Sequence, residues 1–338
     1  MPVESSVSLH DDRLQLFENL SPDEWLLDIR HLKVEYLTPR GPVHAVDDVS
    51  LALKYGEVVG LAGESGSGKS TIAHGVLRIL HSPAQITGGE VLFAGKDVLT
   101  MSPGELQQFR WRAVSIVFQS AMNSLNPVAR IRDQLTDVMR HHGISEAEAN
   151  ERAVKLFDLV CIEPRRLDSY PHQLSGGMRQ RAVIAIALAL NPPLLIMDEP
   201  TTALDVVVQK DILQQIADLR EKLGFSILFI THDLSLLVEF SNRIAIMYAG
   251  EIVEQAPARE LFDRPLHPYT VGLMNSFPSI SGEKKKLSGI PGAPPDLVDP
   301  PGGCRFHPRC PKAMPVCSQV APVTKSMAAG HSVACHLY

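Results

Sequence analysis

The 338-residue sequence lacks a hydrophobic run of the about 18 consecutive apolar residues that a membrane-spanning helix needs. Its longest apolar run, residues 182–190, ends at Asn-Pro-Pro. The first residues also lack the basic segment and following apolar stretch that mark an export signal. We therefore expect a cytosolic protein that neither spans a membrane nor carries such a signal.

The sequence also lacks an excess of basic residues, internal repeats and heptads. Lys and Arg together number 32 and Asp and Glu 38, which gives a net charge of −6. A mildly acidic chain is a poor candidate for holding nucleic acid or anionic lipid through charge. With 45% hydrophobic and 21% charged residues, the composition is that of a globular protein and excludes a disordered or collagen-like chain.

Cysteine is scarce, but its distribution is uneven. Cys161 stands alone, whereas Cys304, Cys310, Cys317 and Cys335 lie close together near the end of the sequence. A reducing cytosol disfavours structural disulfides, so metal ligation is the leading interpretation of the C-terminal group. Cys161 lies in a helical pattern and is expected to be a small buried hydrophobic residue.

Short apolar runs alternate with helical periods, which predicts an α/β fold with a parallel sheet and a helical insertion in its middle. A strand with a bulge is expected from residue 26 onward. Residues 289–303 contain nine Gly or Pro and predict a linker. The other expected strands are 46–53, 57–63, 89–95, 114–119, 193–200, 225–232 and 243–250, and the expected helices are 68–80, 132–142, 146–160, 178–190 and 210–224.

Residues 63–70 read Gly-Glu-Ser-Gly-Ser-Gly-Lys-Ser and match the phosphate-binding pattern G-x-x-x-x-G-K-[ST]. Its glycines let backbone N–H groups turn toward phosphate oxygens at a helix N-terminus. Lys69 is expected to reach the β- and γ-phosphates, and the Ser70 hydroxyl to bind Mg²⁺. The alternative, a Gly/Ser turn that binds nothing, is disfavoured by the strand before it and the helix after it. The predicted nucleotide-binding residues here are Gly63, Glu64, Ser65, Gly66, Ser67, Gly68, Lys69, Ser70 and Thr71.

Two carboxylates, Asp198 and Glu199, follow an apolar strand, and parallel sheets bind ligands where their strands end. Asp198 is expected to hold Mg²⁺ directly or through water, and Glu199 to act as a base or to orient the attacking water. His232, at the end of a later strand, is expected to contact the γ-phosphate and hold water and Glu199 in line. Taken singly, such groups are more often ordinary polar residues at strand ends. Their order after the phosphate-binding pattern favours the catalytic interpretation.

Residues 174–181, Leu-Ser-Gly-Gly-Met-Arg-Gln-Arg, resemble the signature sequence of ABC-transporter ATPases. The resemblance covers residues 26–335. It implies an α/β P-loop NTPase with a RecA-like parallel sheet core, an antiparallel β subdomain, an inserted helical subdomain (about 120–185) and a small cysteine-rich tail. The implied boundaries are an N-terminal tail at 1–25, an ABC ATPase domain at 26–265, a C-terminal extension and linker at 266–303, and the cysteine tail at 304–338.

The resemblance also assigns residue roles. Gln119 matches the Q-loop glutamine, which senses Mg²⁺, and Asp205 matches the D-loop, which crosses the dimer interface. Tyr36 is placed like the aromatic residue that stacks on adenine, although a tyrosine in a half-buried strand is often part of the core. The signature residues Ser175 and Gly177 would contact the γ-phosphate held by the other subunit, and Gly176 between them belongs to the same predicted nucleotide-binding set.

Three segments narrow the branch of the family. Residues 119–127 and the sequence His-Pro-Tyr-Thr at 267–270 resemble parts of dipeptide, oligopeptide and nickel importer ATPases. The spacing C-x5-C-x6-C-x17-C resembles the iron–sulfur motif of one of the two ATPases in such importers. Four thiolates hold either a 4Fe–4S cluster or zinc, and the lack of C-x2-C or C-x4-C pairs favours the cluster; unligated thiols are a third alternative. Three histidines could replace a ligand: His307, His331 and His336.

The resemblance therefore implies an ATP-hydrolysing subunit of a peptide importer at the cytoplasmic face of the inner membrane. ATP and Mg²⁺ would lie between this chain and a second related ATPase, beside two transmembrane permeases and, indirectly, an extracytoplasmic substrate-binding protein. An importer of nickel, opines or oligosaccharides is an alternative. A soluble ABC ATPase acting on DNA or the ribosome is disfavoured, because the chain has one cassette, a single helical insertion and no basic excess. The signature sequence excludes a P-loop kinase.

Overall fold

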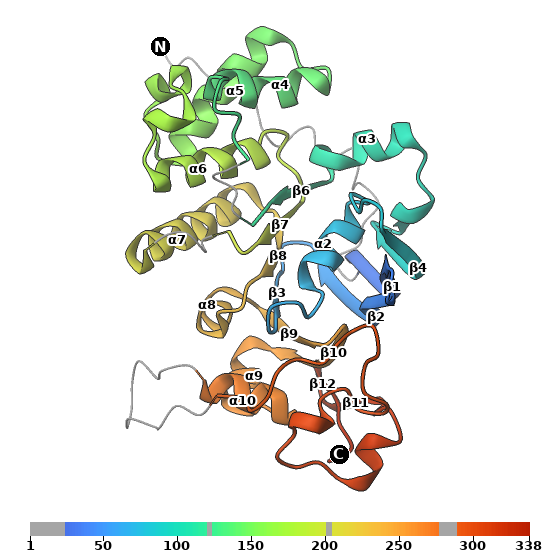
Figure 1. Cartoon of the computed structure of the whole chain (residues 1–338). Helices are drawn as coiled ribbons and strands as arrows, with labels where there is room; N and C mark the ends of the chain where they lie inside the picture. The colour runs from blue at the N-terminus through green and yellow to red at the C-terminus, as the bar shows by residue number, and fades with distance from the viewer. Residues whose placement is uncertain (1–23, 120–123, 201–204, 277–288) are drawn as a thin grey trace. The chain divides into compact units, whose positions relative to one another are not determined.

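The computed structural model describes residues 24–119, 124–200, 205–276 and 289–338 (Figure 1). They form two compact units. The helical unit contains Lys54–Gly56 and Met101–Ile227 together with residues 24–26, and the P-loop unit contains Leu27–Leu53, Glu57–Thr100 and Leu228–Tyr338. Predictions that fall on residues 1–23, 120–123 or 201–204 lie outside the described residues. No helix among the described residues is long and apolar enough to cross a membrane.

The helical unit is built around three helices, α4 (Ile131–His141), α5 (Glu146–Leu159) and α6 (Gly176–Ala187). Both α5 and α6 pack against α4. Apolar residues three or four positions apart form the buried face of each helix, as Leu135 and Met139 do on α4. This is the helical insertion that the sequence predicts.

The same unit contains two parallel strands, the second of which leads to the acidic pair. They are β6 (Val114–Val117) and β7 (Leu194–Asp198), which pair from Val114 with Leu194 to Val117 with Met197. Every residue of β7 is buried, which explains its unbroken apolar run. Helix α7 (Val206–Leu223) follows, and α3 (Pro103–Arg112) precedes β6. Two short 3₁₀ turns complete the unit, η3 (Pro164–Asp168) and η4 (Pro171–Gln173).

The P-loop unit holds an antiparallel sheet with the strand order β2-β1-β4-β5. The strands are β1 (Trp25–Thr38), β2 (Gly41–Lys54), β4 (Ala84–Phe93) and β5 (Lys96–Asp97), and the 3₁₀ turn η1 (Val98–Thr100) follows. The register of β1 on β4 shifts between Arg30 and Lys33, and His31 there has a φ of 50°. The bulge that the sequence predicts in β1 is therefore confirmed.

The second sheet of the P-loop unit has the order β11-β12-β10-β9-β3-β8 within this unit. Strand β3 (Val58–Ala62) pairs in parallel with β9 (Arg243–Tyr248), and β10 (Glu251–Pro257) is antiparallel to β9. The remaining strands are β8 (Ser226–Ile230), β11 (Thr324–Ala328) and β12 (His331–Ala334), and the helices are α2 (Lys69–Val76), α8 (Leu234–Phe240), α9 (Ala258–Asp263) and α10 (Pro268–Asn275).

The cysteine-rich segment is joined to this sheet. Strand β12 pairs with β10 through Val333 and Ser332, and β11 continues the sheet beyond β12. Two 3₁₀ turns, η5 (His307–Arg309) and η6 (Pro315–Ser318), carry much of the rest. Phe306 is buried and contacts the rings of Tyr248 and Tyr269. The segment therefore shares the apolar core of the P-loop unit. The sequence patterns did not predict strands β10, β11 and β12.

One prediction about a cysteine is wrong. Cys161 is exposed, because α5 ends at Leu159 and Cys161 lies in the turn that follows, with a φ of 54°. Its backbone N–H bonds the carbonyl of Asp158, which closes the turn. The helical pattern thus predicts α5 correctly, but Cys161 lies in the turn beyond its last residue and not on its buried face.

Candidate nucleotide site

The P-loop joins β3 to α2 through glycines that no other residue could replace. Gly63 and Gly68 have φ values of 155° and 105°. A Cβ on Gly63 would lie 2.1 Å from the carbonyl oxygen of Met247, and one on Gly68 2.0 Å from that of Ala45. Because β9 and β2 press this closely on the loop, the loop has room for backbone alone at both positions.

Lys69 is the first residue of α2 and is almost completely buried. Its Nζ donates to the carbonyls of Gly63 (2.9 Å) and Glu64 (2.8 Å) and to Ser67 Oγ (3.3 Å). The ammonium is therefore held inside the curve of the loop, where the sequence predicts the phosphates. Ser70 follows as the predicted Mg²⁺ ligand, half-buried on the same helix.

Tyr36 reaches the same helix from β1. Its hydroxyl lies 3.2 Å from Oγ1 of Thr71, and its side chain is half-buried. The structure therefore brings the predicted adenine-stacking residue next to the P-loop helix. Its stacking on a base stays a prediction.

In the helical unit, the structure brings together two predicted catalytic residues. Gln119, just beyond β6, donates from Nε2 to Oε2 of Glu199 at 3.1 Å. Glu199 directly follows β7, with a φ of 45°, and Asp198 is buried. Since the amide nitrogen of Gln119 contacts Glu199, its amide oxygen is the atom suited to Mg²⁺. Mg²⁺ prefers oxygen donors of this kind, and the side chains of Ser70 in the P-loop unit and of Gln119 and Asp198 in the helical unit each offer one.

The other predicted residues occupy the ends of helices. Ser175 is the N-cap of α6 and accepts from the N–H of Met178, and Gly176 begins the helix. A Cβ on Gly177 would lie 3.2 Å from Val208, so this position is tight against α7. Asp205 caps α7 through the N–H groups of Val207 and Val208. His232 is exposed and belongs to the P-loop unit, whereas Glu199 belongs to the helical unit. The predicted alignment of His232 with Glu199 therefore stays a prediction.

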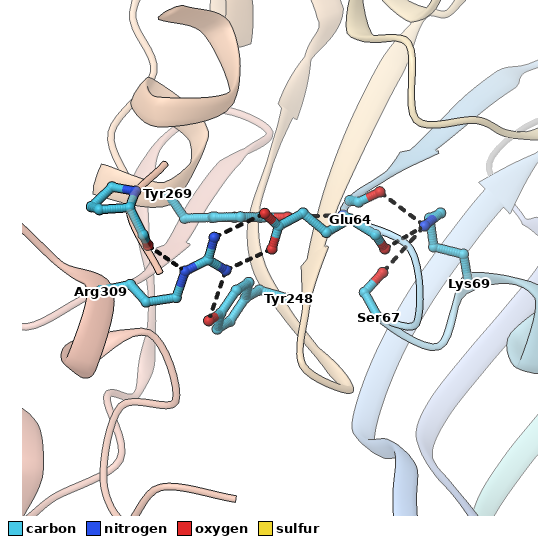
Figure 2. A network of polar contacts seen from close by, with 8 residues as sticks. Glu64, Ser67, Lys69, Tyr248, Tyr269 and Arg309 are labelled. Carbon is cyan, nitrogen blue, oxygen red and sulfur yellow. Dashed lines mark hydrogen bonds and ion pairs between the residues drawn. The ribbon is translucent and has the colours of Figure 1, made fainter. Parts of the chain in front are cut away.

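Sequence reasoning missed the residues that hold the outer side of the P-loop. Arg309 of the cysteine-rich segment forms a bidentate ion pair with Glu64, at 2.7 and 3.0 Å (Figure 2). The hydroxyl of Tyr269 in α10 accepts from the N–H of Glu64 at 2.9 Å. Tyr269 lies in the His-Pro-Tyr-Thr sequence and Arg309 in the cysteine motif, and both segments attracted attention in the sequence. No spacing rule, however, connects either residue with Glu64.

Arg305 makes a second connection. It ion-pairs with Asp47 of β2 and with Glu251 of β10, the latter at 3.0 Å. Burial alone would raise the pKa of Asp47, but hydrogen bonds and charges from Lys33 and Arg305 hold this pKa below its usual value. Asp47 is therefore anionic near neutral pH, and the pair fastens the cysteine-rich segment to β2.

The four C-terminal thiols lie close enough to affect one another. Burial, together with the neighbouring thiols, raises the pKa of Cys304 to about 11. Burial also raises the pKa values of Cys310 and Cys335. Backbone N–H groups of Lys312 and Met314 point at the sulfurs of Cys310 and Cys317. In their chemistry, four sulfur ligands with backbone N–H groups donating to them suit an iron–sulfur cluster. Within the described ranges, however, no three His, Cys, Asp or Glu side chains are arranged as ligands of one metal ion.

The three histidines that could replace a cysteine ligand differ in how many of their ring nitrogens have partners. His331 contacts Glu254 and Glu260 through its two ring nitrogens, at 2.8 and 3.1 Å. The Nδ1 of His307 contacts the carbonyl of Cys304, and the Nε2 of His336 contacts that of Val320. His331 is therefore the poorest replacement ligand of the three, whereas a carbonyl on one ring nitrogen, as in His307 and His336, is the usual second contact of a metal-ligating histidine.

Family models match two parts of the chain. The model described as "ABC transporter" matches residues 46–202, and "Oligopeptide/dipeptide transporter, C-terminal region" matches residues 253–317.

Curated relatives match nearly the whole chain. A peptide ABC transporter ATP-binding protein of Sinorhizobium fredii is 46% identical over 92% of this chain and 94% of its own length. A dipeptide transport ATP-binding protein of Caldanaerobacter subterraneus is 41% identical over 93% and 97%. An oligopeptide transport ATP-binding protein of Salmonella typhimurium is 43% identical over 93% and 94%.

Solved structures show the same fold. The dimeric bacterial ABC transporter cassette MJ0796 aligns with a TM-score of 0.62 and 30% identity, over 69% of this chain and 99% of its own. Its post-hydrolysis state, bound to ADP and Pi, aligns equally well. The predicted α/β ABC ATPase fold is thus confirmed.

Proposed function

Because the chain belongs to the family of ATP-binding subunits of ABC peptide transporters, we propose that it hydrolyses ATP to drive peptide import. The P-loop is the observation that carries this proposal. Its two confined glycines hold the backbone in the phosphate-binding curve, and Lys69 already points into it. A triphosphate would replace the two carbonyls as the partner of Lys69, and the α2 N-terminus would add favourable dipoles.

The chain's own residues divide the chemistry between them. Glu199 activates or orients the attacking water, and the Gln119 hydrogen bond positions its carboxylate. Mg²⁺, held by Ser70, Gln119 and Asp198, would neutralise phosphate charge. His232 contacts the γ-phosphate in this proposal, and Tyr36 stacks on adenine. The support for these roles is the position of each side chain in the motifs, together with the contacts of Gln119 with Glu199 and of Tyr36 with Thr71.

The test is the ATPase rate of the complete transporter carrying Glu199→Gln. Turnover should fall by at least about 100-fold while ATP still binds, because the water loses its base. Glu221→Gln, an exposed carboxylate on α7, is the matched control and should keep the parent rate. Lys69→Ala should weaken ATP binding itself. An unchanged rate in the Glu199→Gln complex would remove this residue from the mechanism.

We propose further that ATP is sandwiched between this chain and a second, related ATPase. The signature residues Ser175–Gly177 would complete the partner's site, and Asp205 would lie at the shared interface. The dimeric form of the structural relative supports this arrangement. Two permease subunits would hold the pair at the cytoplasmic face of the inner membrane, and an extracytoplasmic binding protein would deliver the peptide.

The cysteine-rich segment is proposed to hold a 4Fe–4S cluster through Cys304, Cys310, Cys317 and Cys335. The support is the set of four thiols and the N–H groups aimed at two of them. Such a cluster would supply structural cross-links between loops that have little core of their own. Anaerobically purified protein should contain about four irons per chain, and Cys317→Ser should remove them. Zinc in place of iron would contradict the cluster.

A further inference from the structure

Glu64 is a P-loop residue whose polar groups face two different ways. Its carbonyl accepts from Lys69 Nζ on the inner side of the loop. Its N–H and its carboxylate instead contact Tyr269 and Arg309, which belong to the C-terminal part of the chain (Figure 2). Glu64 thus connects the phosphate-binding lysine with distant parts of the chain. Tyr269 is 205 residues from Glu64, and Arg309 is 245 residues from Glu64.

The Arg309 guanidinium is held from several sides. Besides the two bonds to Glu64, its Nε donates to the carbonyl of Pro291 at 2.8 Å and its Nη1 to the hydroxyl of Tyr248 at 3.3 Å. It also lies over the Tyr248 ring, 5.7 Å from the centroid, and its side chain is 6% exposed. The pairing with Glu64 raises the pKa of Arg309, so this group stays charged. The ion pair is therefore a fixed contact rather than a mobile surface one.

Tyr269 holds the backbone of the same residue. Its ring is fully buried against Tyr248, with 4.6 Å between centroids, and against Phe306. Burial raises the pKa of Tyr269, so its hydroxyl remains protonated. The loop thus has two anchors on its outer side, one to the backbone and one to the side chain of Glu64.

The charge of Glu64 explains why an arginine is needed. A carboxylate in a P-loop repels the triphosphate that the loop must bind, and this repulsion is strong where water is partly excluded. Arg309 compensates the charge and draws the carboxylate to the outer side. We propose, building on the nucleotide-binding function above, that Arg309 is a positioning residue through which the cysteine-rich segment sets the affinity of the P-loop for nucleotide.

The test measures ATP binding to the full-length chain by calorimetry, with Arg309→Gln as the main variant. Its dissociation constant should rise by about 10-fold, a change within the range of energies that contacting residues show. Arg259→Gln is the matched control: this arginine is 81% exposed and pairs with Asp263 on α9. It should bind ATP like the parent. Arg309→Lys, which keeps the charge but not the bidentate contact, should fall between parent and Arg309→Gln.

The double variant Glu64→Gln, Arg309→Gln separates two possible causes of weaker binding. One is the loss of charge compensation at Glu64, and the other is a general unfolding of the cysteine-rich segment. Without the carboxylate there is no charge to compensate, so affinity should return to within about threefold of the parent. A double variant as weak as Arg309→Gln would overturn the proposal, as would Arg309→Gln that binds at parent strength. If the parent chain itself failed to bind ATP, the proposed function would fail instead. The two failures are therefore distinguishable.

Discussion

At the scale of single residues, the motifs were a better guide to the candidate side chains than to the residues that these side chains contact. The pattern G-x-x-x-x-G-K-[ST] places Lys69, and the structure shows it directed into the loop. The contact of Gln119 with Glu199 joins residues 80 positions apart, which only the family resemblance relates. Cys161 shows the opposite case, because its helical pattern predicted burial and the turn at the end of α5 exposes it.

Tyr36 offers a test at this scale. If its ring stacks on adenine, Tyr36→Ala should weaken ATP binding by about 5- to 100-fold, the usual worth of base stacking on an aromatic ring. Tyr36→Phe keeps the ring but loses the contact with Thr71, so it should bind nearly as the parent does. Titration with a fluorescent ATP analogue measures both. Equal losses in the two variants would mean that the hydroxyl, not the ring, is what counts.

At the scale of elements, α10 begins with an unusual cap. The Nδ1 of His267 accepts from the N–H of Tyr269 at 3.1 Å, and the ring is buried. Burial lowers the pKa of His267 to about 4. The folded protein thus binds this proton more weakly than the unfolded chain, whose histidine pKa is 6.5. Stability from this group is present above pH 6.5 and is lost as the pH falls toward 4.

We expect this histidine to cost about 2 kcal/mol of the free energy of unfolding between about pH 7.5 and about pH 5. His267→Asn retains an N-cap acceptor without the titration, so its stability should depend less on pH by that amount. Urea unfolding of both proteins at the two pH values measures the difference. Parallel pH profiles for parent and variant would show that His267 is not the responsible group.

The parallel strands and long helices were predicted from the sequence because their signals are local. An unbroken apolar run predicts β7, and a helical period predicts α4 and α5. Strands β11 and β12 escaped prediction for a physical reason. Strand β11 is exposed along its whole length, and β12 forms because β10, far back in the chain, offers a free edge. No local pattern records such a pairing.

At the scale of the whole molecule, the proposed nucleotide sandwich requires a partner subunit. The resemblance implies that each nucleotide contacts the P-loop of one subunit and the signature of another. Related importers are implied to use two different ATPases, so we expect the intact transporter to contain one copy of this chain and one of a relative. The mass of the native complex tests this. Two copies of this chain with no relative would contradict the mixed pair.

The contact between Glu64 and Arg309 also sets an order of events during protein synthesis. The P-loop leaves the ribosome 245 residues before the arginine that compensates its carboxylate has been made. A chain that has not yet reached residue 309 therefore lacks the outer anchor of the loop. Premature termination after α10 but before residue 309 would leave a polypeptide with the phosphate-binding motif and, with Arg309 acting as proposed, a lower affinity for ATP. Such fragments would have to bind ATP without the charge compensation that Arg309 gives to Glu64.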